Sequence, residues 1–234
     1  MIITKYLQVP ALGTVFNFKH YQPIVPSNVW VVFLHGQGEC GPVDGSELDR
    51  VDKNGWTKDA KAGFEFPFNI IAPQCIKDHR EHIKLFPSFV KLKYNAELIF
   101  VTGLSLGGYG TYDALLHDDL QLIYAIAPVC GAGRLASVTK YRQIPIWHFH
   151  GENDTTVSIK TAKAFIDKYN ALYEPDIRLT PYPGVGHNSW VQAYSIQSGE
   201  DHLLQQFKKW IVEAPKKDLI GSVKSKIINF IQTV

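Results

Sequence analysis

Short runs of apolar residues recur along the chain and predict the strands of a mostly parallel β-sheet. The clearest run, VWVVFL at residues 29–34, is apolar throughout, as is typical of a strand that is buried on both faces. Comparable runs, each followed by proline or glycine, lie at 68–72, 98–102, 123–127, 146–150 and 177–182. Because proline cannot donate to a ladder, Pro181 predicts that the last of these strands lies at an edge of the sheet.

Segments with helical spacing alternate with these runs, at residues 105–117, 158–173 and 200–212. This alternation predicts an α/β fold, in which helices cover both faces of the central sheet. The beginning of the chain, residues 1–28, is expected to add an antiparallel hairpin. Residues 41–67 are polar and contain glycines, so we expect an irregular surface excursion with a short helix.

The last segment, residues 215–234, has apolar residues on one side and lysines elsewhere, which predicts an amphipathic helix. We expect this helix to pack on its own domain or on a second copy of the chain in a homo-oligomer; a membrane surface or a partner helix is the alternative. The length fits a single domain over 1–234. Neither 41–67 nor 215–234 is long enough for a separate lid domain.

Composition excludes several classes of protein. Apolar residues make up 45% of the chain, which is too many for a disordered protein. The 24 basic residues are nearly balanced by 22 acidic ones, so the charge gives no case for nucleic-acid binding. The sequence has no leader pattern and no apolar run of about 18 residues, so we expect no membrane span. Cys40, Cys75 and Cys130 form no C-x-x-C pair and indicate free thiols in a reducing compartment, which predicts a cytoplasmic protein.

The sequence Gly103-Leu104-Ser105-Leu106-Gly107 has the G-x-S-x-G pattern of a nucleophile elbow. It follows the predicted strand 98–102 and opens a predicted helix, which is the context that this pattern requires. The turn is sharp, and its glycines avoid clashes that larger residues would make with neighbouring elements. Ser105 would be presented at a helix N-terminus, where the partial positive charge favours a developing anion.

A serine nucleophile needs a general base. In sequences with a nucleophile elbow, the serine comes first, an acid follows, and the histidine base comes last. His187 lies in a glycine-rich loop after the strand 177–182 and is the predicted base. The loop after the strand 146–150 should supply the acid, for which we predict Asp154, with Glu152 as the alternative. The acid would hold the base in the productive tautomer and stabilise the imidazolium.

An acyl-transfer site also needs N–H donors for the tetrahedral oxyanion. Leu106, the residue after the nucleophile, should supply one, and Gln37 or next Gly38, after the strand 29–34, should supply the other. The sequence has no phosphate-loop pattern. His148 and His150 could suggest a metal, but no H-E-x-x-H context accompanies them, so we expect neither metal nor cofactor.

These features make the sequence similar to the α/β-hydrolases. More narrowly, it resembles the esterase group that includes phospholipase/carboxylesterase, dienelactone-hydrolase-like and "predicted peptidase" proteins. The matching stretches follow the family's order: FLHGQGE at 33–39, IAPQC at 71–75, TGLSLGGYGT at 102–111, APVCG at 127–131, IPIWHFHG at 144–151 and GHNSW at 186–190. One departure is Cys40, because family loops often carry arginine at this position.

The resemblance implies the same triad, Ser105, Asp154 and His187, and hydrolysis of carboxylic esters without a metal. We expect small acyl or aryl esters as substrates, with Trp190 and Trp56 as aromatic walls of the pocket. Many relatives carry an export signal and an extra N-terminal domain; we expect neither for this chain, and we do not expect an exported enzyme that acts on a polysaccharide. Two alternatives stay open: a serine peptidase or amidase with the same triad, and an inactive binding protein on the hydrolase fold.

Overall fold

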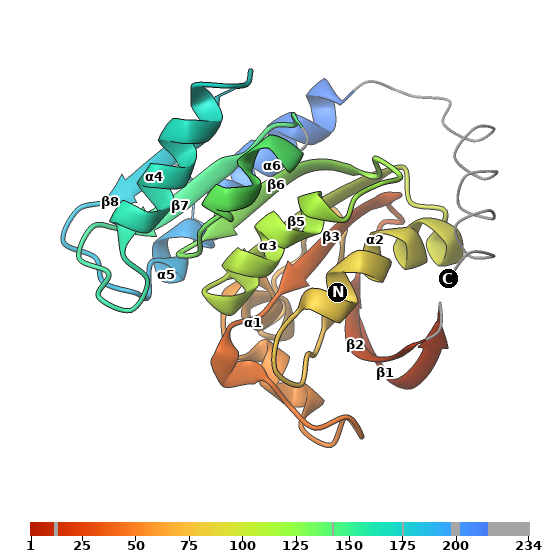
Figure 1. Ribbon diagram of the computed structural model, residues 1–234. Coiled ribbons are helices and arrows are strands. Elements are labelled where there is room, and N and C mark those ends of the chain that lie inside the picture. Colours follow the sequence, from red (N-terminus) through yellow and green to blue (C-terminus); the bar gives the residue numbers. More distant parts are fainter. Residues whose placement is uncertain (12–13, 142, 175, 198–201, 215–234) are drawn as a thin grey trace.

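The computed structural model describes residues 1–11, 14–141, 143–174, 176–197 and 202–214. Within these residues, eight strands form one sheet in the order β1-β2-β4-β3-β5-β6-β7-β8 (Figure 1). The strands are β1 (Ile2–Ala11), β2 (Thr14–Gln22), β3 (Val29–Leu34), β4 (Asn69–Pro73), β5 (Leu98–Leu104), β6 (Ile123–Val129), β7 (Trp147–Gly151) and β8 (Arg178–Tyr182). β1 and β2 pair antiparallel, as do β2 and β4, and the other pairs are parallel. β8, which contains Pro181, lies at the end of this order, as predicted.

Alternate residues of the central strands supply two cores, one on each face of the sheet. In β3, Trp30, Val32 and Leu34 belong to one core, whereas Val31 and Phe33 belong to the other. Because both faces are covered, these strands are apolar at every position, and the predicted α/β fold class is confirmed.

Three helices pack on each face (Figure 1), counting the described residues alone. The first core lies under α2 (Arg80–Tyr94), α3 (Leu106–Leu116) and α4 (Ile159–Asn170). The second lies under α1 (Gly55–Lys61), α5 (Trp190–Ala193) and α6 (Leu203–Glu213). Short 3-10 helices are η1 (Gln37–Glu39), η2 (Leu48–Asp52) and η3 (Leu135–Lys140).

Helix α2 was not predicted from the sequence. Pro87 lies in its interior, where a proline lacks the N–H that normally bonds to the carbonyl four residues back. The aromatic side chains of this helix nevertheless anchor it to the N-terminal strands. The rings of Phe86 and Phe89 pack against Phe16 and Phe18 of β2, with centroids 5.1–6.0 Å apart. The buried aromatic contacts therefore outweigh the local cost of the proline.

Residues 41–67 are less exposed than the sequence suggested. They contain η2 and α1, whose apolar side chains enter the second core, as does Phe66: Leu48, Val51, Trp56, Ala60 and Phe66 are all buried. The predicted helix at 215–234 lies outside the described residues. Within the described part of the chain, no helix combines the length and apolar character that crossing a membrane requires.

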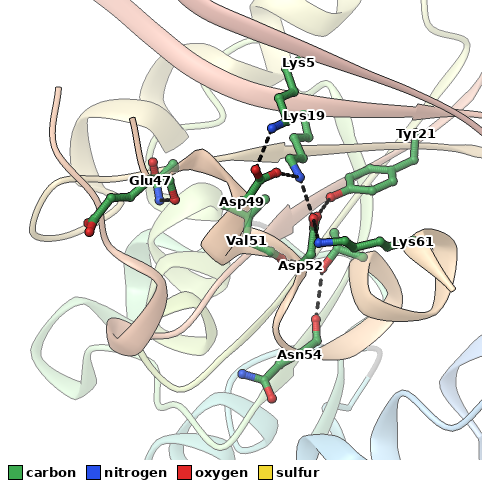
Figure 2. A network of polar contacts seen from close by, with 11 residues as sticks. Lys5, Lys19, Tyr21, Glu47, Asp49, Val51, Asp52, Asn54 and Lys61 are labelled. Atoms are coloured by element: carbon green, nitrogen blue, oxygen red, sulfur yellow. Dashed lines mark hydrogen bonds and ion pairs between the residues drawn. The ribbon is translucent and has the colours of Figure 1, made fainter. Parts of the chain in front are cut away.

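A cluster of charges fixes η2 to the N-terminal strands (Figure 2). Lys19 of β2 lies 2.5 Å from a carboxylate oxygen of Asp49 and 2.5 Å from one of Asp52. The side chains of Lys19 and Asp52 are each 3% exposed, so both charges are almost fully desolvated. Asp52 also accepts hydrogen bonds from Tyr21 and Lys61, whereas Lys5 reaches Asp49 from the surface at 2.6 Å. Each buried charge thus has a partner, which is the condition for burying it at all.

We predict that Lys19→Met lowers the free energy of unfolding by about 3 kcal/mol, because it leaves the buried carboxylate of Asp52 without its main cation. Lys5→Met is the matched control, since it removes an exposed partner of the same cluster and should cost less than about 1 kcal/mol. Urea titrations of both variants measure the difference, and equal losses would show that burial does not decide the strength of this cluster.

Candidate active site

The turn between β5 and α3 places Ser105 at the N-terminus of α3. Its backbone has φ 54° and ψ −112°, a strained conformation that residues other than glycine rarely adopt. The N–H of Ser105 donates to the carbonyl of Val129 at 3.0 Å, and the helix begins at the next residue, Leu106. This geometry is the strand-to-helix turn that the G-x-S-x-G pattern indicates.

Two glycines let this turn approach the end of β3. A Cβ on Gly107 would overlap the carbonyl of Leu34, and a Cβ on Gly103 would lie 2.6 Å from the same oxygen. These obstacles are backbone atoms, which cannot rotate away. In the loop after β3, a Cβ on Gly36 would lie 2.8 Å from Leu104 Cδ1. The serine turn and the loop after β3 therefore pack directly against each other.

His187 comes from the loop between β8 and α5. Its Nε2 lies 2.9 Å from Ser105 Oγ, within hydrogen-bond reach. The loop is tied to the residues after β7, because the N–H of Asn153 donates to the carbonyl of Val185 at 2.9 Å. A Cβ on Gly151 would overlap the carbonyl of Gly186, so this second approach of two loops also depends on a glycine.

Asp154 lies in the loop after β7, and its side chain is fully buried. Oδ2 accepts a hydrogen bond from His187 Nδ1 at 2.7 Å, and Oδ1 accepts from the N–H groups of Thr156 and Val157 at 2.9 Å each. Burial by itself would raise the pKa of Asp154, but these hydrogen bonds outweigh it and lower the pKa below its usual value. Glu152, the alternative acid, is exposed, and the structure brings Asp154 to His187 instead.

The predicted oxyanion donors lie at the first positions of two helical turns. Gln37 is the first residue of η1 and Leu106 the first of α3, and N–H groups at such positions have no partner within the helix. Gly38 follows in η1, and like Gln37 it is exposed. His35 holds the loop, because its Nδ1 lies 2.6 Å from the carbonyl of Gly36 and its Nε2 accepts from the N–H of Cys75 at 3.1 Å.

Asn54, which no motif in the sequence indicates, connects the loop after β3 to Trp190 of α5. Its Nδ2 donates to the buried carboxyl group of Glu39, the last residue of η1 in the loop after β3. Its Oδ1 accepts from Trp190 Nε1 at 3.2 Å. The ring of Trp190 in turn packs edge-on against the imidazole of His187, with centroids 5.5 Å apart. The contact spans 136 residues, so no local pattern in the sequence could have indicated it.

The two predicted pocket tryptophans have different surroundings. Trp190 is half-buried and lies beside His187, and its place in the substrate pocket stays a prediction. Trp56 has no exposed surface and packs among the rings of Phe66, Phe68 and Phe207 in the second core. The expectation that Trp56 lines the substrate pocket is therefore wrong, because α1 turns its apolar side to the sheet.

A pocket of about 340 Å³ adjoins the serine turn, and its lining was not predicted. It is lined by Asp78, His79, Leu106, Tyr109, Gly110, Asp113 and Arg134. Arg134 forms a two-point contact with the carboxylate of Asp113, at 2.6 and 2.5 Å. The pocket is thus polar at Asp78, Asp113 and Arg134, and it includes one of the predicted oxyanion donors.

Among the described residues, one group of three could supply ligand atoms to a metal: His35, Cys75 and His79, whose donor atoms lie within 4.8 Å of one another. Both ring nitrogens of His35 and Nε2 of His79 already take part in hydrogen bonds. His35 accepts from the N–H of Cys75, and His79 Nε2 lies 2.9 Å from the carbonyl of His35. These bonds connect the loop after β3 to Cys75 and His79.

Comparison with known proteins identifies the family. Residues 76–204 match the model of the phospholipase/carboxylesterase family, which is more than half of the chain. The chain belongs to the phospholipase/carboxylesterase family. Among curated proteins, the chain is similar to the bifunctional acetylxylan esterase/xylanase XynS20E of Neocallimastix patriciarum. The two sequences are 30% identical over 82 residues. That match covers 34% of this chain and 12% of the relative.

Solved structures support the same fold for this carboxylesterase-family chain. A thermostable esterase superposes with a TM-score of 0.64 at 24% identity, over 91% of this chain and 62% of that one. TT1662 from Thermus thermophilus gives 0.63 at 14% identity, over 92% and 100% of the two chains. Esterase 2 of Thermogutta terrifontis with bound butyrate gives 0.60 at 13% identity, over 93% and 96%. These likenesses confirm the predicted α/β-hydrolase fold.

We predict that Gly107→Ala destabilises the protein by about 3 kcal/mol or more, because the new methyl group would collide with the backbone of β3. Gly38→Ala is the control, since a Cβ at this position meets no atom within 4 Å. Its free energy of unfolding should stay within about 0.5 kcal/mol of the wild type. Thermal and urea unfolding measure both, and a Gly107→Ala variant as stable as the control would contradict the close approach.

We predict that Asn54→Ala costs about 2 kcal/mol of stability, because it removes partners from both the buried Glu39 carboxyl group and the Trp190 N–H. Asn28→Ala is matched to it, since Asn28 also donates to a glutamate, Glu97, but at the surface. This control should change the free energy of unfolding by less than about 0.5 kcal/mol. Chemical denaturation compares the two, and similar losses would mean that the bridge between the loops contributes nothing particular.

Proposed function

We propose that the chain hydrolyses carboxylic esters, with Ser105 as nucleophile, His187 as general base and Asp154 as the orienting acid. The observation that carries this proposal is the line of contacts from Ser105 Oγ through the imidazole to the carboxylate, 2.9 and 2.7 Å long. Membership of the phospholipase/carboxylesterase family supports an ester as the bond that is cleaved.

The first half of the reaction forms an acyl-enzyme. As Ser105 Oγ attacks the ester carbonyl carbon, its proton passes to His187 Nε2. The negative charge moves to the carbonyl oxygen, where the N–H groups of Leu106 and Gln37 stabilise it. Asp154 keeps the Nδ1 proton of the imidazole in place and stabilises the imidazolium. The tetrahedral intermediate then collapses, and the imidazolium protonates the leaving alcohol.

The second half repeats these steps with water. The imidazole takes a proton from the water molecule as it attacks the acyl-enzyme carbonyl, and the same N–H groups stabilise the second oxyanion. Collapse of this intermediate releases the carboxylic acid and returns the proton to Ser105 Oγ. The triad is therefore restored, and no metal or cofactor enters the proposed cycle.

We propose short acyl esters, acetyl esters among them, as the substrates. The name of the relative XynS20E, an acetylxylan esterase, favours an acetyl group on a sugar hydroxyl. The pocket beside Leu106 is compatible with an alcohol that carries hydroxyl groups of its own, because Asp78, Asp113 and Arg134 are among its lining residues. We also propose a cytoplasmic location, in keeping with three cysteines that form no C-x-x-C pair in the sequence.

We predict that Ser105→Ala lowers kcat for p-nitrophenyl acetate by at least about 10⁴-fold, because no other group replaces the nucleophile. Circular dichroism and the melting temperature should stay close to those of the wild type. Ser46→Ala, which changes an exposed serine, is the control and should keep full activity. Undiminished hydrolysis by Ser105→Ala would reject the assignment.

Matched ester and amide substrates separate the esterase from the peptidase alternative. We expect ester cleavage to be faster by several orders of magnitude, since an amide needs protonation of a poorer leaving group. Labelling of Ser105 by a fluorophosphonate, read by mass spectrometry, separates both enzymes from an inactive binding protein. A wild-type protein that takes no label would contradict the proposed nucleophile.

A further inference from the structure

Two histidines interrupt the apolar sequence of β7. Trp147 and Phe149 of this strand lie in the second core, so His148 and His150 lie on the opposite face, which α3 and α4 cover. Both imidazoles are fully buried. A polar group at such a position costs free energy unless it is hydrogen-bonded, so the partners of the two histidines call for an explanation.

A line of short contacts joins these histidines to the acid. The hydroxyl group of Tyr112 in α3 lies 2.9 Å from His148 Nδ1, and His148 Nε2 lies 2.9 Å from His150 Nδ1. His150 Nε2 then lies 2.8 Å from the carbonyl oxygen of Val157 and 3.2 Å from Asp154 Oδ2. The line therefore runs from α3, through β7, into the turn that carries Asp154.

The chemistry of the groups gives this line one direction. A backbone carbonyl can only accept, so His150 Nε2 must carry the proton in its contact with Val157. Burial lowers the pKa of His150, and it lowers that of His148 well below the usual range, so both rings are neutral. His150 Nδ1 is then an acceptor, so His148 Nε2 donates to it. His148 Nδ1 is an acceptor in turn, and the Tyr112 hydroxyl donates.

We propose that Tyr112, His148 and His150 are positioning residues that hold the 154–157 turn, and with it Asp154, through one directed line of hydrogen bonds. The proposal rests on the proposed function, in which Asp154 orients His187. Val157 and Thr156 bind Asp154 Oδ1, so holding the Val157 carbonyl fixes the same turn that holds the carboxylate. His150 also donates toward Oδ2, the oxygen that accepts from His187.

A packing role alone would leave the proton positions free. The rings of His148 and His150 are stacked, with centroids 5.3 Å apart, and two apolar rings could fill the same space. The two accounts therefore differ in tautomer and in the effect of removing a single donor. Spectra of the protein labelled with ¹⁵N-histidine read the tautomers directly, without any need for activity.

In these spectra we expect both His148 and His150 as neutral rings with the proton on Nε2. Tyr112→Phe removes one hydroxyl group at nearly constant volume and should shift the signal of His148 Nδ1, which loses its donor, while the proton stays on Nε2. A wild-type His148 with its proton on Nδ1, or a charged His150 at neutral pH, would overturn the directed line. A His148 signal unchanged by Tyr112→Phe would also overturn it.

A pair of substitutions at His148 tests the effect on the reaction. His148→Met replaces the imidazole with an apolar side chain of similar length, which has no donor for His150 Nδ1. We expect kcat for p-nitrophenyl acetate to fall about 3- to 10-fold with KM unchanged, the size of one lost hydrogen bond. His148→Gln can still donate from its amide nitrogen and should recover most of kcat. A merely structural role would not distinguish the two variants in this way.

The outcomes separate this proposal from the proposed function. Equal kcat for the wild type and His148→Met, or no recovery in His148→Gln, would overturn the positioning role. If His148→Met does not fold, Tyr112→Phe supplies the kinetic test, with a smaller fall in kcat expected and no fall overturning the role. If the wild type cleaves no ester, the proposed function fails, and the tautomers still decide whether the line exists.

Discussion

The close approach of the serine turn to the end of β3 is the contact on which the site depends. Gly103 and Gly107 bring the turn against the carbonyl of Leu34, where any side chain would collide with backbone. The strained φ of 54° at Ser105 costs on the order of 1–3 kcal/mol, and it persists because this packing leaves the turn no other path. The same contact puts the loop that begins at His35 beside Ser105. A second approach, of Gly151 to Gly186, does the same for the loops that carry Asp154 and His187.

Burial of Asp154 is the electrostatic counterpart of these contacts. A carboxylate with no exposed surface requires compensation, and hydrogen bonds from His187 and from two backbone N–H groups supply it. His150 also faces this carboxylate, but burial keeps its ring neutral. A positive charge on His150 would partly neutralise the carboxylate of Asp154 and weaken its attraction for a charged His187. Because the ring is neutral, the negative charge is left to stabilise the imidazolium that forms on His187 during the proposed reaction.

Local patterns in the sequence predicted the elements that depend on local physics. The central strands could be predicted because a strand covered on both faces requires apolar residues at every position. The serine turn could be predicted because its close contact with backbone requires glycine. Helix α2 could not be predicted because Pro87 disfavours a helix locally. The aromatic contacts that offset this cost in free energy are made with β2, which is distant in the sequence. The polar composition of 41–67 gives no sign that one side of α1 is buried. The sequence therefore favours a surface pocket for Trp56, whereas its side chain lies in the core. Asn54 could not be found, because its partners lie in two distant loops.

These long-range contacts also connect the N-terminal strands to the site. The buried charge of Lys19 fixes Asp52 at the end of η2, and Asn54 follows two residues later. Thr57 closes the intervening turn by donating to the carbonyls of Val51 and Asn54, at 2.6 and 3.0 Å. The position of Asn54 between Glu39 and Trp190 is therefore set from β2, at the far side of the sheet from His187. The Lys19 and Asp52 charges attract each other in a nearly dry environment, which strengthens this attachment of η2 to β2. The antiparallel strands thus help to position Glu39 and Trp190, the two residues that Asn54 connects.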